Sequence, residues 1–279
     1  MSDESAHGDS TRADAIAGSG IDTSVPHSAR IWNYWLGGKD NYAVDRAAGD
    51  AWLATNPQIA AIAREKRAFL RRAVRYLAGE AGVTQFLDVG TGLPTAGNTH
   101  EVAQAVNPAA RVVYVDNDPL VLAHARALLT STAQGGTRYL HADMHDREAL
   151  VRGAGELLNL AEPVAVLFIG VLGHVATADG VRDLVAGIMG QTAPGSYLTI
   201  ADGYTPEAAE EMGLTQAQEE YAESGAVPYR NRTPEVVAGF FGGLEWVEPG
   251  FVPMSTWHPD PVDDPTPSGG GYGGMARKP

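Results

Sequence analysis

The chain has 279 residues, is 44% hydrophobic and carries a formal net charge of -14 at pH 7, so it can bury a sizeable core and should repel nucleic acid. It contains no cysteine, which excludes disulfides, thiolate-bound zinc and cysteine nucleophiles, and its histidines lack metal-ligand spacing. The start shows no signal-peptide pattern, and the longest mostly apolar run, residues 163–176, is too short to cross a bilayer. We therefore expect a cytoplasmic protein without a metal, a membrane span or a nucleic-acid partner.

The two ends of the chain differ in composition from its middle. Residues 1–22 and 259–279 are polar or small and show no periodicity, so we predict a disordered N-terminus and a flexible C-terminal tail. Between them, residues 23–56 are interpreted as an N-terminal lid segment and residues 57–258 as one folded domain.

From residue 57 onward, helical and extended patterns alternate. Helices are predicted at residues 57–79, 100–106, 119–129, 146–158, 179–189 and 234–241. Strands are predicted at residues 85–89, 111–115, 137–142, 163–169 and 195–201. Short strands alternating with helices are typical of a parallel sheet covered on both faces, which is the doubly wound α/β fold.

The end of the folded domain departs from this alternation. Residues 244–257 contain two extended runs around the turn Glu248-Pro249-Gly250. This pattern predicts an antiparallel hairpin at one edge of the sheet.

Basic residues gather on the first predicted helix. They share it with apolar residues at three- and four-residue spacing, so we interpret them as the solvated face of an amphipathic helix and not as a phosphate-binding track. These residues are Arg64, Lys66, Arg67, Arg71, Arg72 and Arg75.

A glycine loop follows the first strand, where Asp88, Gly90 and Gly92 lead toward a helix. Glycines let a backbone approach a ligand closely, and open α/β sheets bind ligands at the carboxyl ends of their strands. A dinucleotide-binding loop would have a third glycine where this chain has Thr95. The loop alone therefore predicts a ligand site but leaves the ligand open.

Acidic residues follow the next two strands. Asp116 lies 24 positions after Gly92, where a carboxylate can accept both hydroxyls of a ribose. Asp118 precedes Pro119 and is interpreted as a helix N-cap. Asp143 could accept an adenine amino group or, alternatively, cap the following helix.

Together these residues resemble a known superfamily. Residues 88–92, Asp116, residues 142–143 and the run "LFIGVLGHV" at 167–175 look like successive motifs of class I S-adenosylmethionine-dependent methyltransferases. With "PHSARIWNYWLGGKDNYAVDR" at the front and "RTPEVVAGFFGGLEWVEPG" at the back, the chain resembles an actinobacterial S-adenosyl methyltransferase family, formerly a domain of unknown function, over about residues 24–258. Relatives often carry two histidines where this chain has Gly173 and His174.

The resemblance implies a Rossmann-like seven-stranded sheet, mostly parallel with a C-terminal antiparallel hairpin, that binds S-adenosylmethionine and methylates a small molecule. The cofactor-binding residues that it implies, together with two from the lid, are Asp88, Gly90, Thr91, Gly92, Asp116, Asn117, Asp143, Met144, Gly170, Tyr34 and Arg30.

The stretch at residues 26–42 is both polar and aromatic, and its adjacent glycines Gly37 and Gly38 disfavour a plain helix. We expect it to fold over the carboxyl edge of the sheet as a lid that excludes water. Arg30 or Lys39 would then lie near the carboxylate of the cofactor. The alternative is an N-terminal helix that packs on the flank of the sheet without touching a ligand.

Methyl transfer mainly needs alignment of the two reactants, and an oxygen or nitrogen nucleophile also needs a group that removes its proton. His174, just past the strand at 163–169, is the predicted catalytic residue; His100 falls inside a helix and is less suited. The predicted substrate residues are Trp35, Lys39, Asn41 and Tyr204, the last next to Asp202 and Gly203.

Two other functions are compatible with the sequence. A nicotinamide-dependent oxidoreductase would explain the glycine loop and Asp116, but not the missing third glycine. A non-catalytic sensor that binds S-adenosylmethionine or S-adenosylhomocysteine would explain the lack of a compelling base and the acidic surface. The sequence leaves the acceptor and the oligomeric state open.

Overall fold

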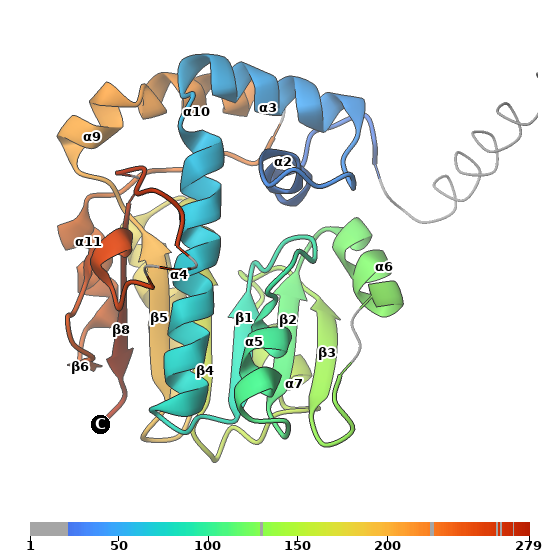
Figure 1. The fold of residues 1–279 in the computed structure, drawn as a ribbon, viewed down its shortest axis with the longest axis vertical. Helices are drawn as coiled ribbons and strands as arrows, with labels where there is room; N and C mark the ends of the chain where they lie inside the picture. The colour runs from blue at the N-terminus through green and yellow to red at the C-terminus, as the bar shows by residue number, and fades with distance from the viewer. Residues whose placement is uncertain (1–21, 129–130, 224–225, 261, 263, 270) are drawn as a thin grey trace, which may run out of the picture.

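A computed structural model describes residues 22–279 apart from 129–130, 224–225, 261, 263 and 270. Its centre is a sheet in which the strands follow the order β3-β2-β1-β4-β5-β8-β6, with β7 also paired to β8 (Figure 1). The strands are β1 (Gln85–Val89), β2 (Arg111–Asp116), β3 (Gly136–His141), β4 (Ala165–Ile169), β5 (Tyr197–Asp202), β6 (Glu245–Trp246), β7 (Val252–Pro253) and β8 (Tyr272–Arg277). The first five strands are parallel, and β8 runs antiparallel to β5.

Helices pack on both faces of this sheet and over its carboxyl edge (Figure 1). They are α2 (Ser28–Trp35), α3 (Ala43–Thr55), α4 (Ile59–Gly79), α5 (Thr99–Val106), α6 (Pro119–Leu128), α7 (Arg147–Ala154), α8 (Ala178–Gly190), α9 (Pro206–Glu211), α10 (Leu214–Glu223) and α11 (Pro234–Ala238). The predicted alternation of strands and helices from residue 57 onward is confirmed, and with it the doubly wound α/β fold.

Alternating side chains of the buried strands supply two cores. On β1, Leu87 and Val89 face a core that includes Leu150 of α7, whereas Phe86 faces a core that includes Phe69 of α4. Because successive side chains of a strand point to opposite faces, a strand buried on both sides must be apolar almost throughout. This is why the parallel strands could be located from short continuous apolar runs.

The prediction of a flexible C-terminal tail at residues 259–279 is wrong, because this stretch contains β8. This strand pairs with β5 along its length, and its Met275 and Ala276 are fully buried. Its glycines made the sequence look irregular, but packing requires them. A Cβ added at Gly273 would lie 2.8 Å from the Phe69 ring, and one at Gly274 would lie 2.8 Å from the Gly250 carbonyl oxygen.

The predicted terminal hairpin is correct in direction but wrong in its partner. The two extended runs at 244–257 become β6 and β7, which do not pair with each other; both pair antiparallel with β8, Glu245 opposite Arg277 and Val252 opposite Gly273. Since β5 occupies the other edge of β8, β6 and β7 share one edge, and the eight strand segments fill seven positions across the sheet. The folded domain therefore extends past residue 258.

Helices α2 and α3 lie over the carboxyl edge of the parallel strands together with α10 (Figure 1). They share one apolar cluster, in which Trp35 and Trp52 meet Ile62 of α4 and Tyr221 of α10. The lid segment predicted at 23–56 is thus built into a helical cap, and α9 and α10 were not predicted as part of it. The disordered terminus predicted at 1–22 lies, apart from Asp22, outside the described residues.

Candidate functional site

The glycine loop after β1 makes a sharp turn that only glycine adopts readily. Gly90 and Gly92 have φ angles of +71° and +68°, in the left-handed region. A Cβ added at Gly90 would lie 2.2 Å from Val171, whereas one added at Gly92 would meet nothing within 4 Å. The Gly92 N–H donates to Asp116 Oδ2 at 2.8 Å, which fixes the loop against the end of β2. The backbone at Gly92 therefore borders open space.

That space is a cavity of about 230 Å³ at the carboxyl ends of β1, β2, β3 and β4, bounded on its other side by α2 and α4. Most of the residues predicted to bind the cofactor come together here, as does the predicted catalytic histidine. Those that line it are Asp88, Gly90, Thr91, Gly92, Asp116, Asn117, Asp143, Met144, Gly170 and His174.

Each of the three predicted aspartates is fixed by neighbours. Asp116 also accepts from the Asp118 N–H at 3.0 Å, and burial raises its pKa. Asp88 accepts from Thr99 Oγ1 at 2.6 Å, and burial raises its pKa to about 6, although Thr99 and Arg67 favour the charged form. Asp143 is more exposed and accepts from His145 Nδ1 at 2.7 Å. The acids thus line one end of the cavity from three successive strands.

Two predictions about helix caps are decided by hydrogen bonds. Asp118 Oδ1 accepts from the Leu120 N–H at 2.9 Å at the start of α6, so its interpretation as an N-cap is confirmed. Asp146, not Asp143, caps α7 by accepting from the Ala149 N–H at 3.0 Å. The capping alternative for Asp143 is therefore wrong; Asp143 instead lines the cavity and accepts from the His145 N–H at 2.9 Å.

Arg30 and Tyr34 do not line this cavity. Arg30 Nε donates to Asp118 Oδ2 at 2.9 Å, in a pair whose side chains are 4% and 0% exposed. Tyr34 Oη donates to Asp50 Oδ1 at 2.5 Å, on the side of α2 that faces α3. Their predicted place at the cofactor is corrected: Arg30 ties the cap to the loop after β2, and Tyr34 joins two cap helices.

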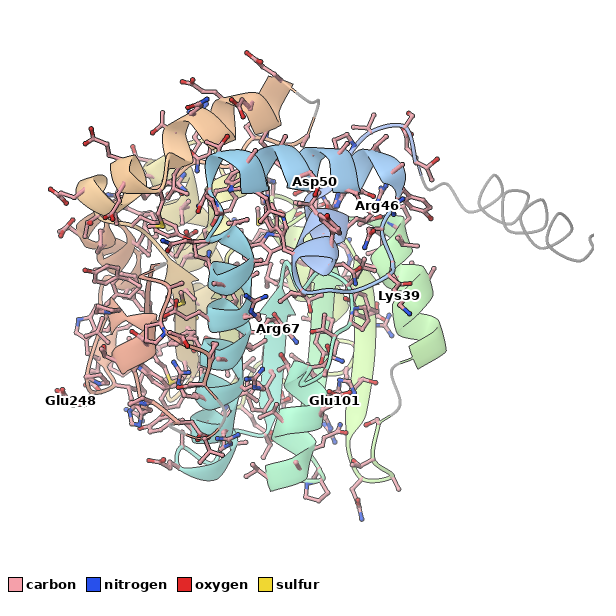
Figure 2. The ribbon with its side chains drawn as sticks, turned by 45° about the horizontal axis from the view of Figure 1, so that its top comes forward. Lys39, Arg46, Asp50, Arg67, Glu101 and Glu248 are labelled. Atoms are coloured by element: carbon pink, nitrogen blue, oxygen red, sulfur yellow. The ribbon has the colours of Figure 1, made fainter. Side chains whose placement is uncertain are left out.

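The loop between α2 and α3 explains the paired glycines. Gly37 has a φ of +81°, and a Cβ added at Gly38 would lie 2.3 Å from the Asn33 amide. Asn41 Nδ2 donates to Asn33 Oδ1 and to the Gly38 carbonyl oxygen, both at 3.0 Å. Lys39 is exposed on the outside of this loop (Figure 2). Asn41 and Lys39 therefore do not reach the site, contrary to their predicted contact with substrate.

The basic residues of α4 are not a single solvated face, as the sequence suggested. Arg64 and Arg75 are exposed, but Lys66 and Arg72 are only 3% and 5% exposed. Arg72 Nε donates to the Trp257 carbonyl oxygen at 3.0 Å. Lys66 and Arg67 line the cavity instead (Figure 2 shows Arg67 between α4 and β1). Their spacing from the buried Ile62, Ala63 and Leu70 was the signal that this face points inward.

A second, narrower space of about 40 Å³ lies under the cap, and we call it the aromatic slot. It shares Ser28, Trp32, Lys66 and His174 with the larger cavity. The slot is lined by Ser28, Ile31, Trp32, Trp35, Trp52, Ile59, Lys66, His174, Tyr204, Leu214, Gln218, Tyr221, Tyr229 and Asn231. Of the predicted substrate residues, Trp35 and Tyr204 are therefore in its walls, while Asp202 lies behind Tyr229, which donates to it at 2.9 Å.

His174 lies where the two spaces meet. Its Nδ1 is 3.2 Å from the Pro228 carbonyl oxygen, which can only accept, so the proton sits on Nδ1 and the lone pair on Nε2. Burial lowers the pKa of His174, which favours this neutral form. Gly173 provides room beside it, because an added Cβ would lie 2.3 Å from the Tyr229 ring. Tyr229 packs on His174 with ring centroids 5.0 Å apart.

Two kinds of feature are not found in the part of the chain that the structure describes. No group of three or more His, Asp or Glu residues there could hold a metal ion. None of the helices formed by those residues has the length and apolarity that spanning a bilayer requires.

Comparison with known proteins shows the family to which the chain belongs. A family model described as S-adenosyl methyltransferase matches residues 14–279. A DUF574 family protein from Streptomyces avermitilis has a similar structure, with a TM-score of 0.87 and 42% identity over 93% of this chain and 100% of that chain. A Thermobifida fusca protein, named provisionally as a methyltransferase, is also similar in structure. Its TM-score is 0.83, and it is 40% identical over 93% of this chain and 97% of that chain. No curated protein matches this chain.

The family resemblance seen in the sequence is confirmed, and nothing in the fold or the comparisons supports an oxidoreductase or a non-catalytic sensor. The chain belongs to the S-adenosyl methyltransferase family and is a methyltransferase whose cofactor is S-adenosylmethionine.

Proposed function

We propose that the protein methylates a small molecule that enters the aromatic slot beside His174. One observation supports this proposal: the large cavity and the aromatic slot differ in chemical character but share wall residues, among them His174. The larger space holds the glycine loop and three aspartates, whereas the slot is mostly aromatic and apolar. A cofactor with an adenosine end suits the first space, and a separate acceptor suits the second.

The residues present fit the cofactor. The open space beside Gly92 accommodates a ligand where any side chain would intrude, and the donors and acceptors around it match an adenosine. We assign ribose hydroxyls to Asp116 and the adenine amino group to Asp143, with the Gly90–Gly92 backbone beneath the ligand. When bound, S-adenosylmethionine supplies a methyl group activated by its sulfonium. The protein then has to orient the acceptor, exclude water and take up its proton.

His174 is the group suited to take that proton. Its ring lines both spaces, and in the tautomer whose Nδ1 faces the Pro228 carbonyl oxygen the lone pair is on Nε2. With the methyl group supplied by bound S-adenosylmethionine, the proton of an acceptor hydroxyl or amine would pass to His174 Nε2. The cap helices α2, α3 and α10 keep bulk water from this position.

Replacing Asp116 with alanine is expected to weaken binding of S-adenosylhomocysteine about 5- to 150-fold, equivalent to about 1–3 kcal/mol for buried polar partners left unpaired. The change removes the proposed ribose acceptor and also the acceptor for Gly92 and Asp118. Isothermal calorimetry measures the effect, with Asp183→Ala, an exposed aspartate on α8, as the control. An unchanged dissociation constant in Asp116→Ala would refute this role.

Replacing His174 with asparagine should preserve the hydrogen bond to Pro228 but remove Nε2. We expect turnover to fall on the order of a hundredfold while S-adenosylhomocysteine binds as before, since proton transfer typically contributes this much or more. In the wild type, activity should decline only below the lowered pKa of His174, because the neutral form is the base and protonation removes it. This acidic decline is expected to disappear in His174→Asn.

A screen for S-adenosylhomocysteine release tests the function itself, first with pooled and then with single small-molecule acceptors. The expected result is turnover with at least one compound small enough for the slot. Methylation of protein or nucleic acid, with none of small molecules, would contradict the proposal. The pH profile of His174→Asn is then measured with the acceptor that this screen identifies.

A further inference from the structure

Lys66 is enclosed by aromatic rings in the wall of the aromatic slot. Its Nζ lies 5.5 Å from the centre of the Trp32 ring and 5.9 Å from the centres of the Tyr204 and Tyr229 rings. Its side chain comes from the middle of α4, so its backbone is rigidly held. An ammonium group surrounded by ring faces is partly stabilised, but it keeps its capacity to donate three hydrogen bonds.

No described residue uses those donors. Lys66 is 3% exposed, yet it forms no hydrogen bond or ion pair with any residue in the described part of the chain. Asp202 is close enough to favour the charged form of Lys66, but its carboxylate accepts from Tyr229 and from the Gly203 N–H, both at 2.9 Å. Burial lowers the pKa of Lys66, and an anion beside it would reverse that effect.

Two more donors in the slot wall lack partners. Trp52 Nε1 and Gln218 Nε2 are buried atoms without a hydrogen bond in the described structure. A buried polar group left unpaired is costly, and native structures rarely keep several at one place. Because Trp52 Nε1 and Gln218 Nε2 are fully enclosed by protein atoms, Lys66 is the group whose donors a ligand with acceptor oxygens would satisfy from the slot.

The walls of the slot differ in charge from the chain as a whole, which has a net charge of -14. Among the described residues that line the slot there is no aspartate or glutamate, and Lys66 is the only lysine or arginine; Asp202 and Glu65 are close enough to favour the charged form of Lys66 but do not line the slot. The carboxylates of Asp88, Asp116 and Asp143 line the other space. Amine or quaternary ammonium acceptors would meet the Lys66 charge and be repelled, whereas an anionic oxygen would be attracted.

The other residues of the slot walls favour an acceptor molecule in which this anionic oxygen is attached to an aromatic ring system. Trp35 and Trp52 lie with ring centroids 5.8 Å apart, and Trp52 and Tyr221 lie 5.3 Å apart. The first pair is tilted and the second is edge to face, and aromatic rings in such arrangements can stack on or contact the edge of a further planar ring.

We infer that the methyl acceptor is an aromatic carboxylate, and that Lys66 selects its negative charge. This inference rests on the proposed small-molecule function, which it makes specific. Lys66 touches the acceptor in this arrangement but takes no part in proton transfer, which stays with His174.

The test uses 4-hydroxybenzoate as the anionic probe and 4-hydroxybenzamide as its neutral match, both titrated into full-length protein saturated with S-adenosylhomocysteine. We expect the carboxylate to bind at least about tenfold more tightly than the amide. In Lys66→Met, which removes the charge but keeps the length of the side chain, this preference should vanish. Arg64→Met, on the exposed side of the same helix, should retain it.

Several results would overturn the inference. Equal affinity of the two probes in the wild type would show that charge is not selected, and absence of binding by both would exclude this ligand class. A loss of S-adenosylhomocysteine affinity in Lys66→Met as large as the loss of probe affinity would assign Lys66 to the cofactor. Turnover of an aliphatic or cationic small molecule, without binding of either probe, would contradict this inference but would still support the proposed small-molecule function.

Discussion

Deleting residues 271–279 should abolish cooperative folding, although the sequence gives this stretch the appearance of a flexible tail. The deletion removes β8, which separates β5 from β6 and β7 in the sheet. It would expose Ile200 and Thr199 on β5, both fully buried, and leave the β5 backbone groups that face β8 without partners, while those that face β4 stay paired. The free-energy cost of the unpaired backbone groups and of the lost apolar burial should exceed the free energy of unfolding of a typical domain, which is roughly 5–15 kcal/mol.

Urea unfolding followed by far-UV circular dichroism measures this effect. The matched controls are deletion of Pro279 alone and Met275→Ala. Met275 is 0% exposed, so its truncation should cost about 2–5 kcal/mol while leaving the fold intact. A deletion variant that unfolds at the wild-type urea midpoint would show that β8 contributes nothing to stability and that residues 271–279 are a tail.

Replacing Arg30 with methionine should lower the free energy of unfolding by about 3–5 kcal/mol, the usual cost of removing one partner from a buried ion pair. Arg30 Nε lies 2.9 Å from Asp118 Oδ2, and both side chains are almost completely buried. Arg30 Nη1 also donates to the Asp22 carbonyl oxygen at 2.8 Å and lies 3.9 Å from Asp45. The substitution leaves Asp118 charged and buried where the cap meets the loop after β2.

The double variant Arg30→Met with Asp118→Asn provides the decisive comparison. Asparagine keeps the oxygen that caps α6 but carries no charge, so it should recover part of the loss. Arg64→Met, at an exposed position of α4, should change stability by less than about 0.5 kcal/mol. If Arg30→Met unfolds like the wild type in urea, the ion pair does not hold the cap in place.

The alternation of strands and helices, the glycine loop and the cap at Asp118 could all be predicted from the sequence, because each follows from local rules. A strand buried on both faces must be apolar throughout, a left-handed turn favours glycine, and an aspartate before proline suits a helix start. The acids at the ends of consecutive parallel strands also had to meet at one edge of the sheet. Asp88, Asp116 and Asp143 were therefore correctly predicted to lie together.

Other features depend on contacts between distant parts of the chain and leave no local pattern. Arg30 has its partner 88 positions away, and the glycines of β8 reflect the space left by Phe69 and Gly250. The aromatic slot joins side chains from α2, α3, α4, α10 and the loops near Tyr204 and Tyr229, so no single segment shows it. By itself, the sequence determined the fold class and the meeting of the glycine loop with three aspartates, whereas only the tertiary structure decided the cap, the eighth strand and the buried lysine in the aromatic slot.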